Sequence, residues 1–235
     1  MYKRQGYGSC DYYTVRGQHY KNRRIFINQS AALRTDEQFR TKEDTAHHCG
    51  DSPLLRLPID KVNAFAIDYM HCICLGVCRR LLVYFFIIRG KGCLSLSTKN
   101  EVSNNLLNLS KFWPSEFSRK PRSLNDIKYW KATEFRSFLF YSGPIVLNKI
   151  PKHHYQLFLL LHCGISLLAG EITAEKLNKA NNFLRHFVAH SATILGNEFV
   201  EMNVHSIIHL PQHCRNFGNI NNFSAFKFEN FLGKI

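Results

Sequence analysis

The order of apolar and polar residues along the chain predicts a mainly helical protein. From residue 68 onward, apolar side chains recur at every third or fourth position, which is the spacing of an amphipathic helix. The clearest case is the segment 174–195, which follows Thr173, a good helix N-cap residue. The segment 152–170 is almost entirely apolar, and we therefore expect it to be a central helix.

The same pattern, together with residues that begin or end helices, predicts the remaining helical segments. The expected helices are Asp68 to about Arg89, 99–109 after a cap at Thr98, 132–142 before a stop at Gly143–Pro144, 198–214 with a distortion at Pro211, and 223–235. The fold class expected from this pattern is mainly α.

Residues 1–58 are expected to form a β-hairpin and loops ahead of the helical domain. The segment YYTVRGQHYKNRRIFIN (12–28) contains two short runs of β-branched and aromatic residues around a basic stretch, which is the pattern of a hairpin. Thr35, followed by acidic residues, predicts a short helix, and 49–60 is rich in Pro and Gly. We therefore divide the chain into an N-terminal segment, 1–58, and a helical domain, 59–235.

The charge of the chain indicates the kind of partner it binds. It carries 31 Lys and Arg residues against 17 Asp and Glu residues, a net charge of +14. Such an excess favours polyanions, nucleic acid first and an anionic membrane surface second. A membrane span is not expected, because the apolar run Leu81–Ile88 has only eight residues and arginine on both sides, whereas a span needs about 20.

The eight cysteines do not predict disulfide bonds. Cys72, Cys74 and Cys78 lie in one helical run, where they are badly placed to bridge distant segments. The sequence also begins without the apolar stretch of a secretory leader. We expect a reducing compartment, in which these three cysteines act as small apolar side chains on a buried helix.

Two histidines have the spacing of metal ligands. His205 and His209 are four residues apart on a predicted helix, so their rings share one face and can both bind a tetrahedral zinc ion. Cys10 is a candidate third ligand, with water in the fourth position, because position 13 is a tyrosine and not the second cysteine of a C-x-x-C pair. The alternative is that His205 and His209 are core residues, and the run His47–His48–Cys49 is a rival source of ligands.

Three further residues attract attention as candidate site residues. Asp68 and His71 begin the apolar helix, where Asp68 is expected to cap the helix and His71 to be a hydrogen-bonded buried residue. Glu229 stands among phenylalanines near the end of the sequence, and it is either a solvent-facing glutamate or a carboxylate with a partner.

Four segments in this order resemble the C-terminal part of DDE transposases of the CACTA/En-Spm type. They are FAIDYMHCICLGVCRRLL, RKPRSLNDIKYWKATEFRSFLFYSGP, NVHSIIHL and FSAFKFENFLG, and they span nearly the whole chain. The resemblance implies an RNase H-like core in which two aspartates and a glutamate hold two divalent ions, Mg²⁺ or Mn²⁺, for attack on DNA. It also implies nuclear localisation.

The resemblance gives roles to particular residues. Asp68 and His71 match the family signature [C/D]-x-x-H inside a helical insertion, and Glu229 matches the catalytic glutamate. Cys10 matches the first cysteine of a C-x-x-C pair, and Tyr13 departs from the second. A more distant likeness is to the catalytic subunit of the V(D)J recombinase. There a histidine pair precedes the glutamate by a number of residues similar to the number that separates His209 from Glu229 in this sequence.

No aspartate of this chain matches the two catalytic aspartates, which would precede residue 1. We therefore expect the helical insertion and the C-terminal helix of the transposase fold without its catalytic sheet, and no catalysis by this chain alone.

DNA binding is expected to rest on basic loops and one aromatic ring. The candidate phosphate contacts are Lys21, Arg23, Arg24, Arg119, Lys120 and Arg122. Trp130 is a candidate for stacking on an unpaired base, with a core tryptophan as the alternative.

The first hypothesis for function is a truncated transposase-derived protein with weak, non-specific DNA binding. The alternatives are a protein-interaction module with an exposed apolar face, or part of a full transposase whose N-terminal half is missing from the gene model or comes from another chain.

Overall fold

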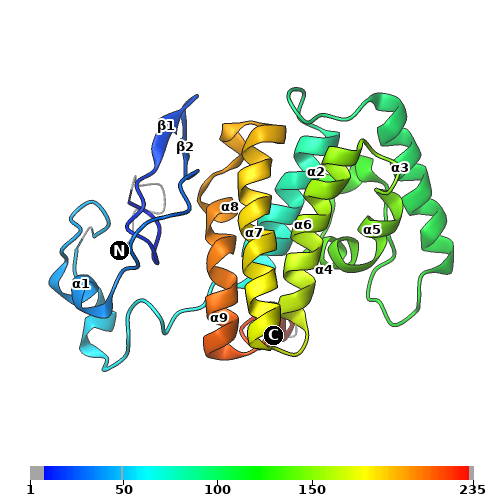
Figure 1. Ribbon diagram of the computed structural model, residues 1–235. Coiled ribbons are helices and arrows are strands. Elements are labelled where there is room, and N and C mark those ends of the chain that lie inside the picture. Colours follow the sequence, from blue (N-terminus) through cyan, green and yellow to red (C-terminus); the bar gives the residue numbers. More distant parts are fainter. Residues whose placement is uncertain (1–7, 49, 233–235) are drawn as a thin grey trace.

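Helices form most of the part of the chain that the computed structural model describes, residues 8–48 and 50–232 (Figure 1). The α-helices are α1 (Asp36–Thr41), α2 (Arg79–Phe86), α3 (Leu96–Leu109), α4 (Ala132–Ser137), α5 (Gly143–Val146), α6 (Lys152–Ala169), α7 (Ala174–Leu195), α8 (Met202–Ser206), α9 (Leu210–Phe217) and α10 (Phe226–Leu232). Two π-helical segments, η2 (Met70–Cys78) and η5 (Phe138–Ser142), precede α2 and α5. Short 3-10 turns are η1 (Pro53–Arg56), η3 (Ser110–Phe112), η4 (Leu124–Tyr129), η6 (Asn197–Phe199) and η7 (Ile207–His209). The mainly helical class is confirmed.

The helices α6 and α7 run antiparallel through the middle of the helical body (Figure 1). Gly164 of α6 lets the two helices approach closely, because a Cβ atom there would come within 2.8 Å of the Leu184 side chain. Phe158, Leu161 and Ile165 of α6 are fully buried, which confirms that this apolar segment belongs to the core. The side chain of Thr173 accepts a hydrogen bond from the backbone N–H of Lys176 and so caps α7 as predicted.

The N-terminal hairpin is present but shorter than the pattern predicted. Strands β1 (Gln18–Tyr20) and β2 (Arg23–Ile25) pair antiparallel, and they form the only sheet in the described residues. The turn residues Lys21 and Asn22 have positive φ angles, as a two-residue hairpin turn requires. Beyond β2, the N–H of Phe26 donates to the carbonyl of Val200, which ties the hairpin to the helical body.

Three expected helix boundaries differ in the structure. The helix expected from Asp68 to Arg89 divides into the π-helical segment η2 and the α-helix α2. The expected stop at Gly143–Pro144 is wrong, because Pro144 occupies the first turn of α5, where its missing N–H leaves no bond unmade. Helix α3 begins earlier than expected, since Ser95 and not Thr98 is its cap.

None of the helices in residues 8–48 and 50–232 combines the length and the low charge that a membrane crossing demands.

Candidate metal centre and neighbouring sites

The thiol of Cys10 and the imidazoles of His205 and His209 lie together, as the sequence predicted, although 199 positions separate Cys10 from His209. Their ligand atoms are all within 4.8 Å of one another, and all three side chains are buried. The Sγ atom of Cys10 is 3.4 Å from Nε2 of His209. Neighbouring ligands in a tetrahedral zinc site are about 3.5 Å apart, given bonds of about 2.0 Å to nitrogen and 2.3 Å to sulfur. The cluster therefore has the geometry of a metal centre.

Two parts of the chain that are distant in sequence build this cluster. His205 belongs to α8 and His209 to the 3-10 turn η7, one helical turn further along the same face. Cys10 comes from the loop before β1, which packs on α8 through a small apolar cluster of Cys10, Val15, Phe26 and Met202. A metal ion here would join the N-terminal segment to the helical body.

His205 is held in the form that binds metal. Its Nδ1 lies 3.2 Å from the carbonyl of Phe26, which can only accept, so Nδ1 carries the proton and Nε2 keeps its lone pair. That Nε2 atom is buried and has no hydrogen-bond partner among the described residues. A buried acceptor without a partner is costly, and a metal ion at the cluster would supply the missing bond. The residues therefore fit a metal ion.

The electrostatics of the cluster follow from its burial. Burial lowers the pKa of His205 to about 4 and that of His209 to about 2, so both rings are neutral at pH 7. Burial also raises the pKa of the Cys10 thiol, while the backbone N–H of Tyr13, 3.3 Å from Sγ, opposes that rise. Metal binding would therefore release the thiol proton, and it would strengthen as the pH rises.

Tyr13 closes the cluster at the position where the resemblance places a cysteine. Its ring lies edge-on to His209, with 4.5 Å between the ring centres. Its hydroxyl points away from the cluster and accepts a hydrogen bond of 2.8 Å from Arg185 of α7. The phenol is therefore no ligand, and within residues 8–48 and 50–232 three side chains form the cluster.

The rival ligands do not join this cluster. Nδ1 of His47 donates to the carbonyl of Gly8 at 2.6 Å, and the ring of His48 packs on Phe39. Neither residue belongs to the Cys10–His205–His209 group. Cys49 lies outside the described residues.

A second constellation joins the three residues that match the transposase motifs. Nδ1 of His71 is 2.6 Å from a carboxylate oxygen of Asp68, and Nε2 is 3.2 Å from a carboxylate oxygen of Glu229. Both contacts are ion pairs when the imidazole is protonated. The side chain of His71 is 57% exposed, which corrects the expectation that it is buried. Sequence reasoning did not foresee its contact with Glu229.

Asp68 holds this constellation together by accepting hydrogen bonds from N–H groups at the N-terminal ends of two helices. Its carboxylate accepts hydrogen bonds from the N–H groups of Met70 and His71, so it caps η2 as predicted. It also accepts a bond of 2.6 Å from the N–H of Ala225, just ahead of α10. One side chain thus positions both His71 and the helix that carries Glu229.

The cysteines of η2 are buried, as expected. Burial raises the pKa of Cys72 and of Cys74 to about 12 and that of Cys78 well above its usual value. They therefore remain thiols and pack as small apolar side chains.

Three of the six predicted phosphate contacts, Lys21, Arg23 and Arg122, form ion pairs with glutamates in the folded protein. Lys21 pairs with Glu198 at 3.3 Å, and Arg23 pairs with Glu201 at 2.6 Å. Arg24 lies opposite His19 in the hairpin.

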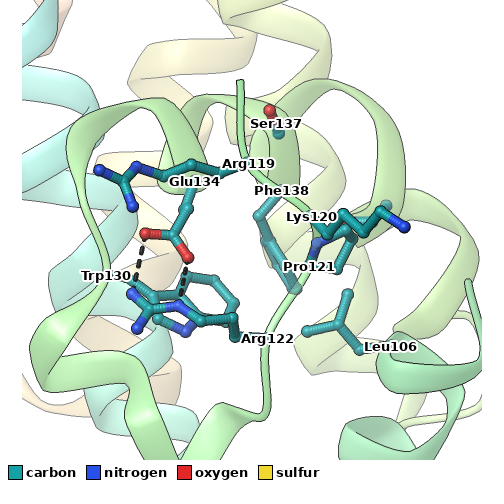
Figure 2. A pocket seen from close by; sticks show the side chains of 10 residues that line it. Leu106, Arg119, Lys120, Pro121, Arg122, Trp130, Glu134, Ser137 and Phe138 are labelled. Carbon is teal, nitrogen blue, oxygen red and sulfur yellow. Dashed lines mark hydrogen bonds and ion pairs between the residues drawn. The ribbon is translucent and has the colours of Figure 1, made fainter. Parts of the chain in front are cut away.

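Only some of the cations in the basic segment that follows α3 form ion pairs with other residues. Figure 2 shows two bonds, of 2.6 and 2.9 Å, from the guanidinium of Arg122 to the buried carboxylate of Glu134. Arg119 and Lys120 line the same shallow depression and form no ion pair with the residues that the structure describes. These two side chains keep their full charge for a ligand.

Trp130 cannot stack on a base. It is 5% exposed, packs on Phe135 and Phe138, and donates its indole N–H to the carbonyl of Ser123 at 3.3 Å. The expectation that Trp130 contacts DNA is therefore wrong, and the alternative, a core tryptophan, is what the structure has. Among the described residues the most exposed aromatic side chain is that of Phe112, at 84%, in the segment KFWPSEF (111–117). Its closeness in the sequence to Trp113, Phe117 and the cations at 111, 119 and 120 was the signal that would have found it.

Comparison of the chain with family models, curated proteins and solved structures found no match.

Proposed function

We propose that this chain is a transposase-derived, DNA-binding protein that carries the glutamate end of a strand-transfer site. The observation that supports this best is the 3.2 Å contact between His71 and Glu229. The two residues match different family motifs and lie far apart in the sequence. A chance likeness gives no reason for the two motifs to meet, whereas a shared site requires it.

In such a site, Glu229 would hold a divalent ion together with two aspartates that no residue of this chain matches. Mg²⁺ or Mn²⁺ would activate water or a 3′-OH for attack on the DNA backbone. His71 would orient the Glu229 carboxylate, since Asp68 fixes the other side of its ring. These residues alone would bind DNA in the nucleus without cleaving it, and the two aspartates would be supplied from outside them, for example by a second transposase-derived chain.

We further propose that the buried cluster of Cys10, His205 and His209 binds zinc. One thiolate and two imidazoles suit Zn²⁺, and water would complete the tetrahedron because Tyr13 offers no ligand. The metal would be structural, joining the N-terminal segment to α8.

Cobalt provides the test, because a thiolate bound to Co²⁺ gives a charge-transfer absorption band. The wild-type protein should show this band, and Cys10→Ser should lose it. The matched control is Cys163→Ser, which removes a half-buried thiol of α6 and should keep the band. A wild-type protein that binds neither cobalt nor zinc would refute the proposed zinc site.

DNA binding is tested by salt and by cross-linking. The net charge of +14 predicts an affinity for duplex DNA that falls steeply as salt rises, because bound counterions are released. Arg119→Ala combined with Lys120→Ala should flatten the slope of log K against log salt by about 2, since each phosphate contact contributes about 0.9. Arg122 is left intact, because removing it would strand the buried charge of Glu134.

The matched control is Lys176→Ala combined with Lys179→Ala, which removes the same charge from α7, where both lysines lie beside glutamates. This control should change the slope less. Photo-cross-linking to duplex DNA should label peptides around His71 and α10, and labelling confined to other regions would contradict the shared site.

One observation supports the alternative that this chain is a protein-interaction module. Phe228 and Phe231 of α10 are 70% and 65% exposed, an apolar face of the kind this alternative predicts. Affinity for DNA that does not change with salt would favour it.

A further inference from the structure

Four aromatic side chains gather where the chain leaves α3. Phe112, at the end of η3, is 84% exposed, the most exposed of the large apolar side chains in the described residues. Trp113 packs on Phe117 with ring centres 4.8 Å apart, and Phe117 packs on Tyr141 at 5.2 Å. Scattered exposed apolar residues need no explanation, but rings that line up on one segment form a surface.

Cations surround these rings. The segment 110–122 contains four Lys and Arg residues and a single acidic residue, Glu116. Lys111 directly precedes Phe112. Arg119, Lys120 and Ser137 line one depression (Figure 2), and Ser142, which follows Tyr141 in the sequence, lines it as well. The aromatic surface is therefore bordered by positive charge that faces solvent.

The segment is fixed in place before any ligand arrives. At one end Phe117 rests on Tyr141 of η5, and at the other end Arg122 is anchored to the buried Glu134 by two hydrogen bonds. Pro121 further restricts the backbone between these anchors, and Pro114 restricts it directly after Trp113. Fixing the rings in advance lowers the entropy lost when a ligand binds.

We infer that this segment binds single-stranded nucleic acid by stacking unpaired bases on Phe112 and on the Trp113–Phe117–Tyr141 row. Aromatic rings flanked by cations on both sides in the sequence suit a ligand with flat apolar faces on an anionic backbone. A duplex does not offer those faces, because its bases already stack on each other. An acidic protein partner would use the cations but has no need for a ring at position 112. This inference deepens the proposed DNA binding and rests on it.

The experiment compares a labelled oligothymidine of about 16 nucleotides with a duplex of the same length, using fluorescence anisotropy. Phe112→Ala should weaken binding of the single strand about 5- to 100-fold, the loss expected for one stacked base, and leave duplex binding unchanged. Phe112→Tyr, which keeps a ring, should bind like wild type. Phe112→Leu, which keeps apolar bulk without a ring, should behave like the alanine variant.

Two controls test whether the single strand binds at Phe112 and Trp113 and not elsewhere. Leu96→Ala removes another highly exposed apolar side chain at the opposite end of α3 and should change neither affinity. Tryptophan fluorescence should be quenched by the single strand, and Trp113→Phe should abolish that quenching, because Trp130 is buried.

Wild-type affinity of Phe112→Ala or Phe112→Leu for the single strand would overturn the inference. Salt-dependent duplex binding could still stand in that case, so the two failures are distinguishable. A chain that binds neither oligonucleotide would overturn both the inference and the proposed DNA binding.

Discussion

Tyr13 occupies the position at which the resemblance places a second cysteine. The backbone around Cys10 brings its thiol to His205 and His209, and the N–H of Tyr13 points at the sulfur. The side chain has turned to Arg185, and its ring covers His209. The position is therefore close enough to supply a fourth ligand, but its chemistry is wrong.

Tyr13→Cys should restore a set of two thiolates and two imidazoles. Closed tetrahedral zinc sites contribute on the order of 10 kcal/mol of apparent binding free energy, so the variant should bind one zinc tightly and melt at a higher temperature with zinc than without it. A chelator-competition titration and thermal melting measure both effects. The matched control is Tyr13→Ser, which makes the same cavity without a thiol. Equal melting temperatures of the two variants in zinc would contradict the prediction.

Among the elements, the π-helical segment η2 depends on a cap that it shares with α10. The N-terminal N–H groups of a helix need acceptors, and Asp68 serves Met70, His71 and, across the fold, Ala225. The orientation of Glu229 therefore depends on Asp68, which lies 157 positions before Ala225 in the sequence.

Asp68→Ala should lower the free energy of unfolding by about 1–2 kcal/mol, the usual cost of a lost cap. The residues of α10 should exchange their amide hydrogens faster, because Ala225 loses its acceptor. Urea unfolding and hydrogen–deuterium exchange measure the two effects. Asp51→Ala removes a carboxylate from an exposed ion pair with Lys42 and should cost less than about 0.5 kcal/mol. Unchanged exchange in α10 would show that Asp68 does not hold that helix.

On the scale of the whole molecule, buried histidines make the fold sensitive to acid. Burial lowers the pKa of His47 and of His213 to about 4, and it lowers that of His154 as well. In the unfolded chain these rings accept protons below about pH 6.5. Because the unfolded chain then binds more protons than the folded one, stability is complete above pH 6.5 and is lost as the pH falls towards 4.

The free energy of unfolding in a chelator should therefore decrease between pH 7.5 and pH 4.5, by on the order of 2–3 kcal/mol for a fully buried ring such as His47. His47→Asn keeps a donor for the carbonyl of Gly8 but cannot titrate, so its urea unfolding should depend less on pH. His190→Asn replaces an exposed histidine of α7 and should keep the wild-type dependence. A wild-type stability that does not change over this range would contradict the argument.

The sequence by itself determined the features that depend on neighbours along the chain. The helical periodicity located α6 and α7, the side chains of Thr35 and Thr173 cap their helices, and the basic turn of the hairpin lies where two short β-type runs meet. These features arise from hydrogen bonds and apolar spacing within a few residues, so a short stretch of sequence contains the information.

Only the tertiary structure decided which distant side chains meet and which way rings face. The contact of His71 with Glu229, the burial of Trp130 and the exposure of Phe112 depend on how helices pack, and no local pattern encodes packing. Cys10 was a candidate partner of His205 and His209 because a thiol binds zinc and because of the resemblance, and no local pattern placed it beside them. The stop expected at Pro144 failed for a local reason, because the structure places this proline in the first turn of α5, where its missing N–H leaves no bond unmade.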